Sequence, residues 1–151
     1  MQNSFKQNIY TSCFQVLESR IQQLQNDLRG LKEGTENDSK SSAGDKHETA
    51  RAMMQIEYEK ISRLLEEIQR QKNELEKIDI HSVSGIIKNG SIVKTNNGHF
   101  FLGAAVGKLD VDGVQVMTIT LQSPIGQKLF GQKKDDFIDM NGLKYVIENI
   151  E

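Results

Sequence analysis

The chain of 151 residues contains one cysteine, one proline and no long apolar run. A single cysteine, Cys13, excludes an intramolecular disulfide framework and is typical of proteins in a reducing compartment. No window approaches the ~18 consecutive apolar residues that a membrane-spanning helix needs. The first residues also lack a charged segment followed by an apolar one, so we expect a cytoplasmic protein with no membrane partner.

The sequence also lacks an excess of basic charge, with 19 Lys and Arg against 21 Asp and Glu. The formal net charge is −2, so no overall positive field draws the chain to nucleic acid or to an anionic membrane. A nucleic-acid role would therefore have to be local or supplied by a partner. With 36% apolar and 26% charged residues, the chain fits one ordinary domain or two small units, and a single compact core is not required.

What the sequence does contain, in its first half, is two apolar seams with alternating spacings of four and three. The first seam is Tyr10, Phe14, Leu17, Ile21, Leu24, Leu28 and Leu31, and the second is Met54, Tyr58, Ile61, Leu65, Ile68, Leu75 and Ile78 or Asp79. Lys72, between Ile68 and Leu75, is the one clearly polar seam position. This spacing predicts two coiled-coil helices. Because two seams of matched length can cover each other by folding back, we expect an antiparallel hairpin over residues 1–79 and a monomeric chain. Association of the helices between chains is the alternative.

The interval between the seams, residues 34–47, has almost no apolar side chains. Composition alone predicts a flexible loop there. A second helix from Glu48 to Ile78 would be about 45 Å long at ~1.5 Å per residue, and its partner must then extend to near Ala43. We therefore expect partial helix in this interval, frayed near the end of the hairpin.

After Asp79 the pattern changes to that of strands. β-Branched and aromatic runs occur at Ile86–Ile87, Ser91–Thr95, His99–Leu102, Val114–Leu121 and Lys144–Ile147. The dipeptides between or beside them that supply positive φ for tight turns are Asn89-Gly90, Asn97-Gly98, Asp112-Gly113 and Asn141-Gly142. Residues 80–151 are thus expected to form an antiparallel sheet of about five strands, which makes the chain an α+β protein.

One short helix is expected on this sheet. Pro124 suits the first helical position and Ser123 the cap before it, with the helix ending near Phe130. Gly131 then stands where a left-handed C-terminal cap is expected. A terminal hairpin over residues 135–150 follows.

This C-terminal pattern resembles that of the GreA/GreB family of bacterial transcript cleavage factors, in which a Ser-Pro-(Ile/Leu) step opens a short helix before the last strand pair. The resemblance implies a coiled-coil hairpin followed by an FKBP-like domain. The family carries Gly-Asp-Leu-Ser-Glu-Asn-Ala or a close relative at the end of the hairpin, and the corresponding stretch here is 44–50. Gly44, Asp45, Glu48 and Ala50 match at identical spacing.

The resemblance also implies a function. The hairpin would enter the secondary channel of RNA polymerase, where Asp45 and Glu48 would help to hold a Mg²⁺ ion shared with the polymerase active site, for hydrolysis of backtracked RNA. Mg²⁺ prefers carboxylate and water oxygens, which fits the pair. The protein would bind no cofactor alone and would be an accessory factor rather than an enzyme. Ser123, Pro124 and Ile125 resemble the loop that docks on the polymerase.

Other interpretations of these residues stay open. Asp45 followed three residues later by Glu48 is also a capping box, and Ser123 and Pro124 can simply start a helix. Lys46 and His47 replace neutral residues of the family pattern. A non-catalytic regulator that binds the same channel is therefore the second hypothesis, and a coiled-coil adaptor for protein binding is the third.

Two further residue types are assigned no chemistry. Cys13, beside the seam residue Phe14, is expected to be an inert and partly buried thiol, because no Cys/His/Asn constellation accompanies it. His47, His81 and His99 lie far apart without ligand-type neighbours, so no zinc site is expected.

Overall fold

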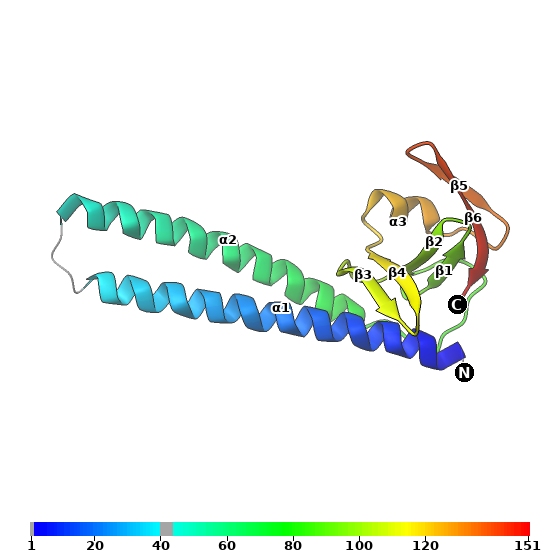
Figure 1. Cartoon of the computed structure of the whole chain (residues 1–151), viewed down its shortest axis with the longest axis horizontal. Helices are drawn as coiled ribbons and strands as arrows, with labels where there is room; N and C mark the ends of the chain where they lie inside the picture. Colours follow the sequence, from blue (N-terminus) through cyan, green and yellow to red (C-terminus); the bar gives the residue numbers. More distant parts are fainter. Residues whose placement is uncertain (1, 40–43) are drawn as a thin grey trace. The chain divides into compact units, whose positions relative to one another are not determined.

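A computed structural model describes the backbone of residues 2–39 and 44–151, and the side chains of residues 5–34 and 48–151. In chain order the elements are α1 (Gln2–Ser39), α2 (Gly44–Glu76), β1 (Ile92–Thr95), β2 (Gly98–Leu102), β3 (Gly107–Val111), β4 (Val114–Ile119), α3 (Pro124–Leu129), β5 (Phe137–Met140) and β6 (Leu143–Ile150) (Figure 1). The chain divides into two compact units. One is Leu17–Arg70, and the other combines Met1–Val16 with Gln71–Glu151.

The unit Leu17–Arg70 is a helical hairpin, as the two seams predicted. Its portions of α1 and α2 run antiparallel and side by side (Figure 1). Gly34 of α1 lies opposite Met54 of α2, because a β-carbon added to Gly34 would be 3.6 Å from Cε of Met54. This contact gives the register of the two helices near the end of the hairpin. Ile61, a predicted seam residue, is buried with 8% of its surface exposed. The α+β class with an N-terminal helical hairpin is thus confirmed.

The polar interval is partly helical. Helix α1 continues to Ser39, and α2 begins at Gly44, four residues before the predicted start at Glu48. Residues 40–43 lie outside the described part of the chain. At its other end α2 stops at Glu76 rather than Ile78. The backbone of α1 thus stays helical beyond Leu31, the last position of the first predicted seam, and into the polar interval.

The second unit contains a six-stranded sheet of order β3-β4-β2-β1-β6-β5. All pairs are antiparallel except β2 with β4, which run parallel. The predicted antiparallel pairing is confirmed for every pair except β2 with β4, and the predicted number of about five strands was one too low. Ile86–Ile87 makes only an isolated bridge, Ile86 with Lys133, rather than a strand. β3 was missed, and β5 was predicted only as part of the terminal hairpin over residues 135–150.

Two of the four predicted turn dipeptides close hairpins of this sheet. Asn97-Gly98 is not one of them, because Thr95 pairs with Gly98 and the turn between β1 and β2 is Asn96-Asn97, and Asn89-Gly90 lies before β1. Asp112 and Gly113 have φ of 52° and 79°, and Asn141 and Gly142 have 52° and 81°. Consecutive positive φ values are those of a type I′ turn, whose twist matches that of the paired strands. The terminal hairpin is therefore confirmed, with Met140 opposite Leu143 beside its turn.

One face of the sheet carries a closed apolar core beneath α3. Its buried residues are Ile87, Val93, Phe100, Leu102, Ile119, Leu129, Ile138 and Ile147. Alternation along β1 and β2 places Ile92 and Phe101 on the opposite face. The helical ends of the same unit supply Ile9, Cys13 and Leu75, all buried, and we infer that they cover this second face.

The short helix forms as predicted. Ser123 is its N-cap, and its Oγ accepts a hydrogen bond from the backbone N–H of Gly126 at 3.1 Å. Pro124 occupies the first turn, where no intrahelical donor is lost. Gly131, just after the helix, has φ of 84°, the left-handed conformation expected of it.

Candidate functional site

The candidate site is the end of the helical hairpin at the start of α2. Glu48 is the fifth residue of α2, about 6 Å along the axis from Gly44 at ~1.5 Å per residue. Its side chain is exposed. The backbone of Asp45 lies in the first turn of the same helix, and its side chain lies outside the described residues.

The spacing of the pair follows from the helix that carries it. Residues three apart in an α-helix are neighbours on its surface, and the backbone positions of Asp45 and Glu48 have this spacing within α2. Asp45 is the second helical residue rather than the residue before the helix, which departs from its interpretation as the N-cap. A carboxylate in the first turn is still favoured by the helix dipole.

The donor set at this end suits a divalent cation only in part. Two carboxylates can supply oxygen ligands to Mg²⁺, which takes six and keeps several waters. Among the side chains that the structure describes, no three His, Cys, Asp or Glu groups converge as a metal site. Glu48 is the one carboxylate of the predicted pair whose side chain the structure describes, and the metal-binding role of Asp45 and Glu48 stays a prediction.

Arg51 is the described cation nearest in sequence to this end. It lies three residues after Glu48 and is exposed. Lys46 and His47, which were singled out from the sequence in this stretch, have side chains outside the described part of the chain. An exposed arginine one turn from a carboxylate can contact a phosphate, which suits an RNA or nucleotide partner.

In the sheet-bearing unit, Ser123, Pro124 and Ile125 begin α3. Ser123 is half-buried, and its Oγ also donates a hydrogen bond to the carbonyl oxygen of Thr120 at 2.7 Å. Ile125 packs partly against the apolar core, whereas Pro124 is exposed. Ser123 and Ile125 thus have structural roles, and Pro124 is the one of the three whose side chain is fully available to a partner.

Exposed apolar side chains were not singled out from the sequence. In the sheet-bearing unit Phe130, Phe137 and Leu143 are each more than half exposed. On α2 the exposed ones are Met53, Ile56, Tyr58 and Leu64. The signal that could have found Met53 and Leu64 is a second four-three spacing beside the predicted seam, which is developed below.

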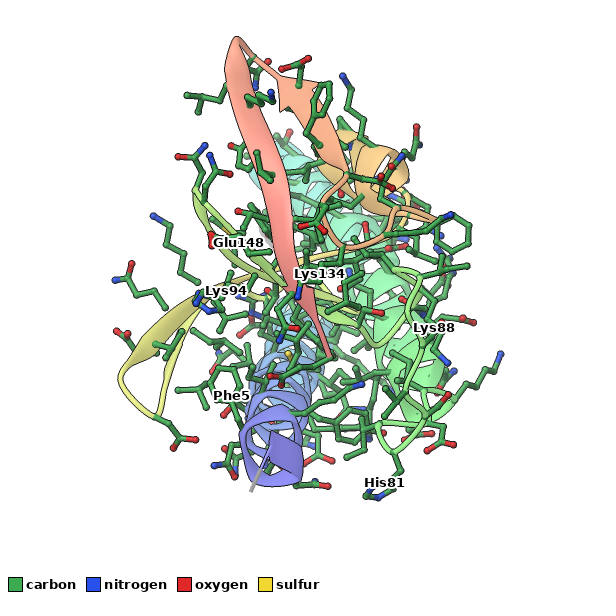
Figure 2. The ribbon with its side chains drawn as sticks, turned by 90° about the vertical axis from the view of Figure 1, so that its right-hand side faces the viewer. Phe5, His81, Lys88, Lys94, Lys134 and Glu148 are labelled. Carbon is green, nitrogen blue, oxygen red and sulfur yellow. The ribbon has the colours of Figure 1, made fainter. Side chains whose placement is uncertain are left out.

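A shallow depression lies where α2 leads into the sheet. It is lined by Glu74, Lys77, Ile78, Asp79, Ser82, Lys88 and Asn89. The Lys88 Nζ donates to Ser82 Oγ, and Figure 2 shows Lys88 and His81 on the segment that joins α2 to β1. Nearby Lys6 is 6% exposed, and its pKa is lowered mainly by burial and next by the Lys88 charge. Side chains of both charge signs line this depression, so its charge favours no particular class of ligand.

The thiol of Cys13 has no accessible surface. Burial raises its pKa from an ordinary 9.0 to about 12. A thiol is a nucleophile only as the thiolate, so Cys13 carries no chemistry at neutral pH. The sequence predicted a partly buried, inert thiol, and in the structure the side chain is fully buried.

This burial predicts an alkaline loss of stability that Cys13→Ala removes. Because the folded state holds the thiol protonated up to about pH 12, the unfolded state loses its proton first, and stability falls as pH rises above 9. Between pH 8 and 10 the wild-type chain should lose about 1.4 kcal/mol more than Cys13→Ala. Urea unfolding at both pH values measures the difference, and equal slopes for the two proteins would show that the thiol is solvated.

Within the described residues, no helix is both long enough and apolar enough to cross a membrane. No family model, curated protein or solved structure matches the chain significantly.

Proposed function

We propose that this protein is a Gre-like transcription elongation factor, which binds RNA polymerase through its secondary channel and stimulates cleavage of backtracked RNA. The observation that carries the proposal is the acid pair at the end of an antiparallel helical hairpin. A hairpin of two paired helices is narrow and stiff, and the portions in Leu17–Arg70 extend about 40 Å at ~1.5 Å per residue. Such an element can carry Asp45 and Glu48 into a channel too narrow for a globular domain.

The chemistry assigned to this chain is limited to what its own residues can do. Asp45 and Glu48 would supply carboxylate oxygens to Mg²⁺ and accept hydrogen bonds from a water beside it, while the polymerase supplies the remaining ligands and the RNA. Pro124, exposed at the start of α3, belongs to the proposed docking loop with Ser123 and Ile125. An FKBP-like fold for the sheet-bearing unit is part of the same proposal.

A transcript cleavage assay tests the proposal. The wild-type protein, added to RNA polymerase stalled in a backtracked complex, should shorten the transcript. Asp45→Ala combined with Glu48→Ala should reduce cleavage to that of polymerase alone and leave polymerase binding unchanged. The matched control is Glu59→Ala with Glu66→Ala, which removes the same two charges from exposed positions of α2 farther from its start. Normal cleavage by the first variant would exclude the two acids from the reaction.

The cations of this end favour a second candidate function. Arg51 is exposed beside Glu48, and Lys46 precedes it. Positive charge near two carboxylates weakens their attraction for Mg²⁺, which suits a regulator that occupies the channel without promoting cleavage. Polymerase binding without transcript shortening would select this function. Absence of polymerase binding would leave the coiled-coil adaptor.

A further inference from the structure

Helix α2 has an apolar stripe in addition to the seam that it turns toward α1. Met53 is 66% exposed, Ile56 65% and Leu64 47%, whereas Ile61 on the inner seam is 8% exposed. A single exposed apolar side chain is common on protein surfaces. Three of them within twelve residues of one helix form an apolar patch, and such patches often mark interaction sites. All of them lie within the helical unit Leu17–Arg70.

The stripe has the spacing of a coiled-coil seam. Met53, Glu57, Lys60 and Leu64 follow one another at steps of four, three and four. At ~100° per residue these four positions fall within about 60° of one another on the helix, and Ile56 lies beside them. Glu57 and Lys60 are both exposed, so the stripe presents an apolar residue at each end and one charge of each sign between them.

We propose that a second copy of this chain docks on the stripe, with the two α2 helices antiparallel. In an antiparallel pair the order Met-Glu-Lys-Leu of one helix lies against the order Leu-Lys-Glu-Met of the other. Apolar residues then face apolar residues, and opposite charges face each other. When two copies are related by a two-fold axis between residues 58 and 59, Met53 faces Leu64 of the second copy and Glu57 faces Lys60. Each contact occurs twice. A parallel, in-register pair would instead place Glu57 against Glu57 and Lys60 against Lys60, which is repulsive.

The size of the stripe sets the strength of the association. Eleven steps along a helix span about 16 Å at ~1.5 Å per residue. Such a contact buries much less than the ~800 Å² per partner of a stable interface. The dimer is therefore weak and reversible, and the monomer expected from the sequence predominates in dilute solution. The inference does not rest on the proposed function, because the surface requires no polymerase.

Sedimentation velocity of the full-length chain over a range of concentrations tests this pairing. The wild type should shift from monomer to dimer as concentration rises. Glu57→Lys and Lys60→Glu should each weaken the dimer at least about tenfold, because like charges then face each other twice. The combination of both changes restores opposite charges and should restore association. Leu64→Lys should also weaken it at least about tenfold.

A matched control separates this seam from charge effects elsewhere. Glu66→Lys makes the same charge change at an exposed position on another side of α2 and should leave the dimer unchanged. A chain that stays monomeric at the highest soluble concentration would overturn the proposal. A dimer that is insensitive to Glu57→Lys and Leu64→Lys, or that the double exchange fails to restore, would also overturn it. Circular dichroism of each variant verifies that the helices remain folded.

Discussion

Replacing Gly126 with alanine is expected to destabilise the sheet-bearing unit by about 3 kcal/mol or more. A β-carbon at this position would lie 2.0 Å from the carbonyl oxygen of Thr120 and 2.8 Å from Oγ of Ser123. Both distances are far inside van der Waals contact. The oxygen of Thr120 cannot move cheaply, because it accepts hydrogen bonds from the Ser123 hydroxyl at 2.7 Å and the Ser123 N–H at 3.2 Å.

The clash leaves the chain two responses, and both are costly. Either the start of α3 moves away and the cap of Ser123 is lost, or the end of β4 shifts and disturbs the core beneath the helix. Loss of the cap alone accounts for about 1 kcal/mol. The remainder comes from core packing, since buried Gly126 and Leu129 both lie in α3.

Urea unfolding followed by NMR signals of the sheet measures this effect. Gly85→Ala is the matched control, because Gly85 is exposed in the same unit and a β-carbon there would meet nothing within 4 Å. Its free energy of unfolding should change by less than about 0.5 kcal/mol. If the two variants unfold at the same urea concentration, the close approach of Gly126 to Thr120 is not present in solution.

The second large effect is expected for Phe101→Ala, at about 3 to 5 kcal/mol of lost unfolding free energy. Phe101 is a fully buried aromatic residue in β2, the strand between β1 and β4. Its ring also lies close to Gly103, where an added β-carbon would come within 3.0 Å of it. Strands on both sides and the turn after β2 hold the surrounding backbone, so the cavity left by the ring cannot collapse fully.

Phe130→Ala is the matched control for this change. It removes the same atoms from the residue that follows α3, where the ring is 54% exposed. The expected loss is below about 1 kcal/mol, because most of that ring already contacts water. Both variants are compared by the same urea unfolding. Equal losses would mean that Phe101 is as solvated as Phe130 in the folded protein.

The parts of the fold that depend on neighbouring residues were predictable. The two heptad seams predicted the helical hairpin, because helix pairing depends on a spacing that each segment carries in itself. Ser123, Pro124 and Gly131 predicted the ends of α3 by the same kind of local rule. Asp112-Gly113 and Asn141-Gly142 likewise predicted tight hairpins, since their conformational preference does not require distant contacts.

Strand order was not predictable from these local rules. β2 pairs with β4 in parallel, and β3 lies outside β4 at the edge of the sheet. β3 itself was missed because Lys108 and Asp110 interrupt its apolar pattern. Both side chains are exposed, whereas Val111 is buried and Leu109 half-buried, and the strand is completed by its antiparallel pairing with β4. Such pairing depends on a partner supplied by another part of the chain.

For the candidate site, the sequence placed Asp45 and Glu48 near the start of the second helix, and the structure has α2 begin at Gly44. Their role in transcript cleavage stays a prediction. The stripe of Met53, Ile56 and Leu64 was missed, because a spacing pattern shows which residues share a helix face but not whether that face is covered.

The sequence by itself determined where helices, turns and the short capped helix form, because these depend on spacings and conformational preferences within about ten residues. Only the tertiary structure decided which strands pair, which side chains are buried and how closely backbones approach. It alone shows that Thr120 leaves no room for a side chain at position 126. It also shows that a second face of α2 remains exposed. Burial and close approach arise between segments distant in the chain, so no local pattern encodes them.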